Sequence, residues 1–170
     1  MNVLAIDPGT YQSAWTVVGG GNTVTQFGKR TNEEVLDGLR MSLYGWHTVD
    51  IVVVEMMTSY GKPVGNEVFE TIVWIGKFLE AACHTFDKVD RLTRREVKNY
   101  ICRGHRKKND SRVRSCLIER YGEGGMDAIG TKRNPGPLYG VVGDMWAALA
   151  VGITYRELHL IDKPPALKED

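Results

Sequence analysis

Three acidic residues stand where carboxylates commonly meet in α/β proteins. Asp7 follows a short apolar run, Glu55 ends the run DIVVVE, and Asp144 falls in the first turn of the last predicted helix. Because the carboxyl ends of strands open into the ligand crevice of an α/β sheet, we expect the three carboxylates to converge there. Carboxylates suit Mg²⁺ and Mn²⁺, and two such ions about 3.5–4 Å apart stabilise both the attacking and the leaving oxygen of a phosphodiester. The pattern predicts a hydrolytic metal site.

Each acid also has a purely structural interpretation. An Asp at a helix start, such as Asp144, is often a cap or a partner of the helix dipole. A Glu that ends a strand, such as Glu55, is often only solvated. Asp7 differs, since Pro8-Gly9 after it predicts a tight turn that leaves the carboxylate open. On spacing alone these alternatives stay open.

Positive charge is concentrated in one stretch of the chain. The 170 residues contain 22 Lys and Arg against 21 Asp and Glu, a net charge of +1 that by itself indicates no attraction to nucleic acid. Residues 91–120, however, hold eleven Lys or Arg against three acids, which makes this window +8 and the other 140 residues −7. Such a stretch predicts either contacts to phosphates or a solvated face.

The elements that must position these residues follow the order β-β-β-α-β-α-β-α-α-α. The predicted strands cover residues 2–6, 12–18, 23–27, 50–55 and 89–92, and the predicted helices start at Thr31 or cover 66–84, 94–102, 110–121 and 141–159. Three meander strands followed by crossovers predict an α/β fold, a mixed sheet of about five strands flanked by helices. Residues 1–160 are expected to form a single domain and residues 161–170 a charged, Pro-containing tail.

Apolar stripes on two predicted helices indicate core or interface positions. Helical spacing predicts a helix with Val35, Leu36, Leu39 and Leu43 on its apolar face. On the next helix, Trp74, Ile75 and Phe78 are expected in the core or in a dimer contact, and on the last helix Trp146, Leu149 and Ile153 in the core. The Gly- and Pro-rich residues 122–139 predict a long loop.

The remaining composition narrows the location of the protein. Cys83, Cys102 and Cys116 form no CxxC pair, which is typical of reduced thiols in a cytosolic protein. The sequence has neither a basic leader with an apolar core nor an apolar stretch of roughly 20 residues. We therefore expect a cytoplasmic protein without membrane association and without an organic cofactor.

Three segments resemble one known family. IDPGTYQSAW, VVVEMMTSYGKPVGNEVFETIVWIGKF and GDMWAALAVGITY, in this order, resemble the RuvC-type Holliday junction resolvases of the RNase H-like superfamily, most closely the small phage-encoded branch. The resemblance implies an RNase H-like fold and a homodimeric endonuclease that cuts branched DNA, above all four-way junctions. It further implies two Mg²⁺ or Mn²⁺ ions per active site, with Asp7, Glu55 and Asp144 as catalytic metal ligands. A phage enzyme would work in the host cytoplasm.

One position departs from the family pattern. Bacterial members commonly carry an acid or a His three residues before the last-helix Asp, whereas this chain has Val141. Either three acids suffice or a fourth ligand comes from elsewhere.

Several residues are candidates for contacts with DNA. Lys108, with Lys107, precedes a predicted helix N-terminus, a natural anion site, and is our candidate for a catalytic Lys that offsets transition-state charge; simple phosphate contact is the alternative. Tyr60 follows the second acid and is expected either to stack on an unpaired base or to pack or lie exposed in its loop. The predicted DNA-binding residues are Tyr60, Lys62, Arg94, Arg95, Lys98, Arg103, Arg106, Lys107, Lys108 and Arg112.

Two other function classes stay open. A junction-binding protein without catalysis would explain the missing acid at Val141. The D-P-G-T stretch is also typical of actin-like nucleotide binders, but these usually have a duplicated domain, for which 170 residues leave little room.

Overall fold

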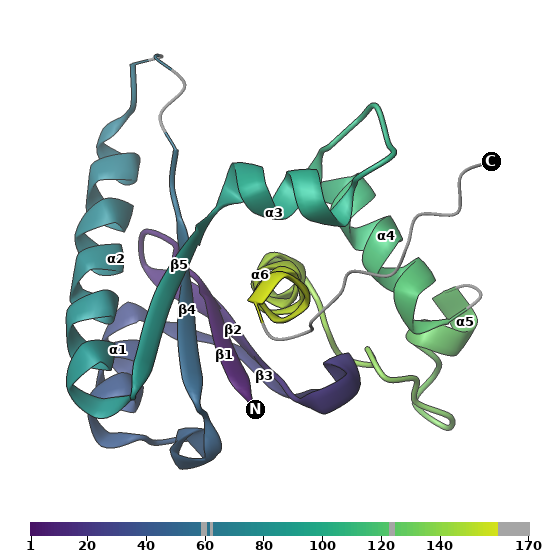
Figure 1. Ribbon diagram of the computed structural model, residues 1–170, viewed down its shortest axis with the longest axis horizontal. Helices are drawn as coiled ribbons and strands as arrows, with labels where there is room; N and C mark the ends of the chain where they lie inside the picture. Colours follow the sequence, from purple (N-terminus) through teal and green to yellow (C-terminus); the bar gives the residue numbers. More distant parts are fainter. Residues whose placement is uncertain (59–60, 62, 123–124, 160–170) are drawn as a thin grey trace.

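A five-stranded mixed sheet lies at the centre of the computed structural model, which describes residues 1–58, 61, 63–122 and 125–159 (Figure 1). The spatial order is β3-β2-β1-β4-β5, with β1–β2 and β2–β3 antiparallel and β1–β4 and β4–β5 parallel. The strands are β1 (Val3–Asp7), β2 (Gln12–Val18), β3 (Val24–Thr31), β4 (Ile51–Met56) and β5 (Lys88–Thr93). The predicted α/β class with about five strands is confirmed.

Helices cover both faces of this sheet. They are α1 (Asn32–Met41), α2 (Asn66–Thr85), α3 (Arg94–Ile101), α4 (Asp110–Tyr121), α5 (Gly125–Ala128) and α6 (Met145–His159), with short 3₁₀ turns at Gly20–Asn22 and Trp46–Thr48. The pair α1 and α2 packs on one face, while α6 packs on the other, with α3 and α4 on its outer side (Figure 1).

The side chains of the central strands alternate between two cores. Leu4 and Ile6 of β1 pack toward α1 and α2, whereas Val3 and Ala5 pack toward α6. Because both faces of the sheet are covered, residues 51–54 of β4 are all buried, which explains the uninterrupted β-branched run.

Helix α6 is buried on nearly all sides. The predicted stripe of Trp146, Leu149 and Ile153 is buried, and so are Ala148, Ala150 and Gly152 between these positions. A Cβ on Gly152 would lie 2.8 Å from Cγ2 of Val18, so the helix approaches the sheet closely at this point.

The start of α6 differs from the prediction. The helix begins at Met145 instead of near Val141, since Gly143 adopts φ +54° and interrupts helical geometry. Asp144 therefore precedes the helix instead of lying in its first turn, and its backbone oxygen accepts from Ala147 N–H at 2.9 Å.

Two other local predictions were wrong. Leu43 lies beyond the end of α1 and is 37% exposed, because Ser42 turns the chain with φ 49°. The stretch 122–139 includes the four-residue helix α5, which is too short to show a periodicity. The predicted domain limits at 160 and 161 stay a prediction, since residues 160–170 lie outside the described ranges. Among the described helices, none has the length and apolar character that a membrane span requires.

Candidate active site

Asp7 is the last residue of β1, and Glu55 is the next-to-last residue of the adjacent parallel strand β4. Ile6 of β1 is paired with Val54 of β4, so the next residue on each strand stands side by side at the carboxyl edge of the sheet. The Glu55 side chain is 8% exposed and that of Asp7 is 15% exposed. The strand pairing therefore places two carboxylates together, largely out of water.

The turn after Asp7 is held by side chains from neighbouring elements. The buried Asn32 at the start of α1 donates from Nδ2 to the backbone oxygens of Gly9 and Thr10, at 3.0 and 3.1 Å, and accepts from Ser13 Oγ at 2.7 Å. A Cβ on Gly9 would lie 2.5 Å from the backbone oxygen of Gln12. The turn is as tight as expected, but the Asp7 carboxylate beside it is more buried than the prediction of an open carboxylate implied.

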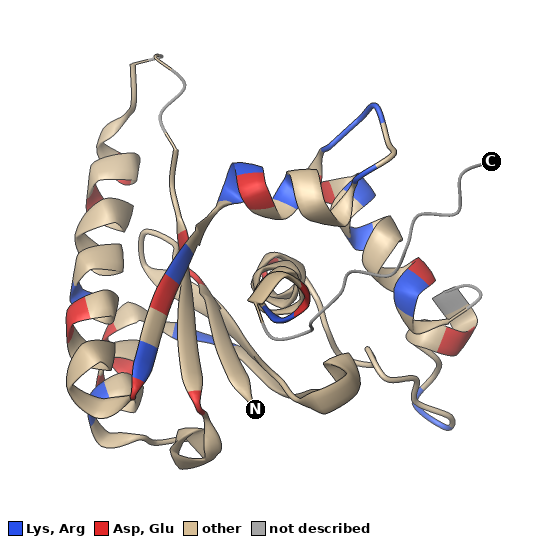
Figure 2. Ribbon diagram, viewed as in Figure 1, with Lys and Arg blue, Asp and Glu red and all other residues tan. Residues whose placement is uncertain are grey.

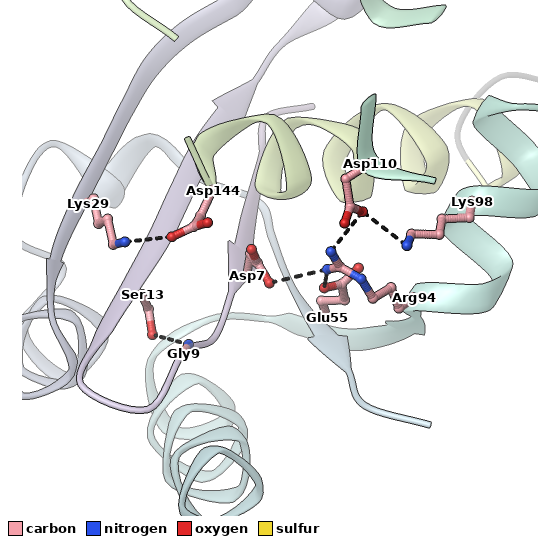
Figure 3. Close-up of polar contacts among 9 residues, drawn as sticks. All are labelled: Asp7, Gly9, Ser13, Lys29, Glu55, Arg94, Lys98, Asp110 and Asp144. Atoms are coloured by element: carbon pink, nitrogen blue, oxygen red, sulfur yellow. Dashed lines mark hydrogen bonds and ion pairs between the residues drawn. The ribbon is translucent and has the colours of Figure 1, made fainter. Parts of the chain in front are cut away.

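Asp144 approaches the same edge from the start of α6. Its side chain is 57% exposed, and its Oδ2 lies 2.5 Å from Lys29 Nζ on β3 (Figure 3). Asp7 and Asp144 line a common cavity of about 410 Å³, together with Arg94, Asp110 and Arg114. The structure thus brings the three predicted acids to one site.

Arg94 is the first residue of α3, directly after β5, and its guanidinium lies in the cluster of carboxylates. Its Nη1 lies 2.8 Å from Glu55 Oε2 and 3.9 Å from Asp7 Oδ1, while its Nη2 lies 2.9 Å from Asp110 Oδ1 (Figure 3). Lys98 Nζ lies 3.0 Å from the same Asp110 oxygen. The ion pairs tie the first residue of α3 to the two strand ends and to the start of α4.

A capping box fixes the position of Arg94. Thr93 accepts from Glu96 N–H, and the Glu96 carboxylate accepts in return from Thr93 N–H at 2.7 Å. This sequence signal begins α3 directly where β5 ends, so Arg94 emerges beside the end of β4.

Asp7 and Glu55 share the guanidinium of Arg94 as an ion-pair partner. Burial, the nearby Glu55 carboxylate and Asp144 together raise the pKa of Asp7 to about 9, against the opposing effect of Arg94. A buried pair of oxygen donors that holds a proton at neutral pH fits a hard divalent cation, which would supply the missing charge.

The other residues predicted to bind DNA are exposed, half-buried or outside the described part of the chain. Arg95, Arg106 and Lys107 are exposed, and Figure 2 shows Lys and Arg gathered on α3, on α4 and on the loop between them. Arg112 is half-buried on α4. Tyr60 and Lys62 lie outside the described residues.

Two predicted cations point away from the carboxylates. Lys108 Nζ donates to Asn99 Oδ1 at 3.0 Å, and Lys108 is not among the described residues that line the cavity. Arg103 lies over the Tyr100 ring, 4.8 Å from its centroid, and lines a separate cavity with Arg120.

Three residues at the site had no place in the sequence prediction. Lys29 contacts Asp144 across 115 positions of the chain, and no local signal marks such a contact. Asp110 begins α4, where an acid is usually explained by the helix dipole. Arg114 lies over the Trp146 ring, 5.1 Å from its centroid, and lines the cavity; helical spacing places it on the face of Asp110 and was the available signal.

Comparison with known proteins shows the fold. No family model matches the sequence, and no curated protein matches it. The Thermus thermophilus RuvC in complex with a Holliday junction substrate is similar in structure, with 20% identity, a TM-score of 0.65, and coverage of 91% of this chain and 92% of that one. The fowlpox virus Holliday junction resolvase has 15% identity, a TM-score of 0.53, and coverage of 93% and 99%. The yeast mitochondrial Holliday junction resolvase Ydc2 has 10% identity, a TM-score of 0.52, and coverage of 89% and 74%. The chain therefore has the same fold as these resolvases.

Proposed function

We propose that the protein is a metal-dependent endonuclease that cuts branched DNA, with four-way junctions as its substrate. The observation that carries this proposal is the buried pair of Asp7 and Glu55 at adjacent strand ends, beside Asp144. Two of the similar solved proteins are Holliday junction resolvases and a third, RuvC, is in complex with a Holliday junction substrate, which supports this substrate class.

Mg²⁺ or Mn²⁺, two ions per site, would be held by the carboxylates of Asp7, Glu55 and Asp144. When bound, such ions activate water and offset charge on a phosphodiester. Val141 is buried and offers no donor, whereas Asp110 lines the same cavity as Asp7 and is our candidate for the fourth carboxylate.

The residues around the carboxylates would orient the phosphodiester. Arg94 and Arg114 line the cavity with fixed positive charge, so a phosphate that enters it exchanges water for guanidinium donors. Arg94 holds Glu55 and Asp110 in place, and Lys29 holds Asp144. The exposed cations of α3, α4 and the loop between them are in position to contact the backbone of DNA arms (Figure 2).

We also propose that the enzyme is a homodimer that pairs through α2. Phe69, Ile72 and Val73 are 56%, 40% and 52% exposed and lie three to four residues apart, so they form one apolar stripe. Ile75 and Phe78 of the same helix are buried in the core, which leaves the stripe for a partner. A second active site at a fixed distance would allow two strands of a junction to be cut together.

Cleavage of a labelled four-way junction tests the enzymatic proposal. We expect nicks near the branch point with Mg²⁺ or Mn²⁺, none in EDTA, and little cutting of a duplex of the same arm sequence. Three-way and flap substrates in parallel define the branch preference. Junction binding without cleavage at any metal concentration would contradict the proposal and favour a junction-binding protein, the alternative suggested by Val141.

A further inference from the structure

A second group of metal-ligating side chains lies where the loop after α3 meets α4. One ligand atom each from His105, Cys116 and Glu119 lies within 4.8 Å of the other two. Cys102, at the end of α3, neighbours Cys116 in the same buried core cluster. None of these four residues lines the cavity that holds Asp7 and Asp144.

The backbone brings the four residues together by two local devices. Cys102 and His105 belong to one turn, closed by the N–H of His105 donating to the Cys102 oxygen at 3.1 Å, and Gly104 permits it with φ +83°. Cys116 and Glu119 lie three residues apart and thus on one face of α4. The spacing C-x₂-H-x₁₀-C-x₂-E is that of two ligand pairs on a turn and a helix.

Burial and charge fit a cation with sulfur and nitrogen preference. Cys102 is fully buried and Cys116 is 5% exposed, while His105 and Glu119 close the group on the solvent side. Within the described ranges, Glu119 makes no ion pair.

We propose that Cys102, His105, Cys116 and Glu119 bind one structural Zn²⁺ ion. Thiolate, imidazole and carboxylate are all zinc ligands, and four protein ligands close a tetrahedral site. With Zn–S distances of about 2.3 Å and Zn–N distances of about 2.0 Å, the ligand atoms around a zinc ion lie closer to one another than the 4.8 Å found for His105, Cys116 and Glu119, so zinc binding would draw these side chains together. Binding releases the two thiol protons to solvent.

The ion would join the loop 102–109 to α4. This loop carries Arg106, Lys107 and Lys108, so zinc would fix the exposed cations relative to the helix. The zinc site is independent of the proposed nuclease activity, because none of its ligands belongs to the carboxylate cluster.

Metal content and Co²⁺ spectroscopy test the site directly. We expect one zinc per chain after dialysis of protein purified without chelator, and a sulfur-to-cobalt charge-transfer band when Co²⁺ replaces zinc. The carboxylate cluster contains no sulfur and cannot produce this band, which separates the two sites. His105→Ala changes only an exposed side chain, and we expect it to weaken zinc binding by about 100-fold, measured in competition with a chromophoric chelator.

Matched variants keep the test falsifiable. Cys83→Ser and His84→Asn remove an exposed cysteine and an exposed histidine of α2 and should retain zinc and the cobalt band. Cys102→Ser and Cys116→Ser should each reduce the band by about half, and the double variant should lose it. The proposal would be overturned if His105→Ala retained its zinc affinity, or if the unaltered protein held no more zinc than Cys116→Ser. A Cys102–Cys116 disulfide in protein prepared anaerobically would also overturn it. Activity toward junctions does not enter this outcome.

Discussion

Nη1 of Arg94 lies 2.8 Å from Oε2 of Glu55, so a fixed positive charge stands inside the cluster of carboxylates. The guanidinium also reaches Asp7 at 3.9 Å and Asp110 at 2.9 Å, and it partly offsets the repulsion between the two buried acids. A divalent cation at the same carboxylates must compete with this charge or move it aside.

Arg94→Gln is therefore expected to act in opposite directions on stability and metal affinity. Without metal, the variant leaves Glu55 unpaired and lowers the free energy of unfolding by about 1–2 kcal/mol. This is less than the loss of a fully buried ion pair would cost, because Arg94 is partly exposed. With the competing charge gone, Mn²⁺ affinity rises, as measured by calorimetry and by the metal-induced shift in Tm. The neighbouring exposed Arg95→Gln is the control, and a weaker Mn²⁺ affinity in Arg94→Gln would show that the guanidinium supports the metal instead.

Removal of single carboxylates should separate cutting from binding. Asp7→Asn, Glu55→Gln and Asp144→Asn are each expected to lower the cleavage rate by about 1,000-fold, roughly 4 kcal/mol of transition-state stabilisation. Junction affinity in EDTA, measured by fluorescence anisotropy, should change little, because the proposed DNA contacts lie on other elements. Asp37→Asn, an exposed acid of α1, should behave like the unaltered protein. Full activity in Asp144→Asn would remove Asp144 from the metal site.

The raised pKa of Asp7 makes the stability of the metal-free protein dependent on pH. The folded state binds a proton at Asp7 up to about pH 9, whereas the unfolded chain releases it near pH 3.8. The stabilising contribution of Asp7 is thus complete below pH 3.8 and is lost as pH rises toward 9. In EDTA, Asp7→Asn should raise Tm relative to the unaltered protein, by about 2 °C or more at pH 8, and the difference should shrink toward pH 4. A difference that is constant over this range would contradict the protonated state of Asp7.

Salt dependence of junction binding tests the loop between α3 and α4. If Lys107 and Lys108 each neutralise one phosphate, replacing both by Ala lowers the slope of log Kd against log salt by about 1.8. The control is the pair Lys77→Ala and Lys88→Ala, which removes the same charge from α2 and β5. An unchanged slope would exclude the two loop lysines from the DNA path.

The proposed dimer is tested by placing charge in the apolar stripe of α2. Val73→Lys, at a side chain that is 52% exposed, should convert the dimer to a monomer in sedimentation equilibrium without a loss of helicity. Met41→Lys at the end of α1 is the control, because it introduces the same charge at an equally exposed apolar position. A dimer that persists in Val73→Lys would place the interface elsewhere.

Strand ends and apolar periodicity predict the sheet and favour a meeting of the three acids, while their spacing alone also fits a structural role for each. Asp7 and Glu55 end strands whose parallel pairing is implied by their burial, so their proximity follows from topology alone. The involvement of Arg94 was not predictable in this way, since a basic residue in a basic stretch is ordinarily assigned to the surface. Its inward position depends on the abrupt passage from β5 to α3.

Contacts between segments that are distant in the sequence could not be predicted, for a different reason. The pair of Lys29 and Asp144 depends on how β3 twists past the start of α6, and no spacing in the chain reports that geometry. Lys108 was assigned near the carboxylates from its place before a helix, but a loop side chain has several orientations, and here it donates to Asn99. Cys102 and His105 belong to no CxxC pair, so this signal did not indicate the turn that brings them together.

The burial of α6 determines which wall of the active site is able to move. Ten residues of α6 from Trp146 to Arg156 are buried between the sheet and α3, so displacing α6 would expose the core on that face of the sheet. Asp144, which directly precedes α6, is thus attached to a rigid element, as Asp7 and Glu55 are on the sheet. The opposite wall, formed by the starts of α3 and α4 and their exposed connection, has far less buried area to lose. A bulky substrate would then enter by displacement of the starts of α3 and α4 and their connection, while α6 and the sheet stay in place.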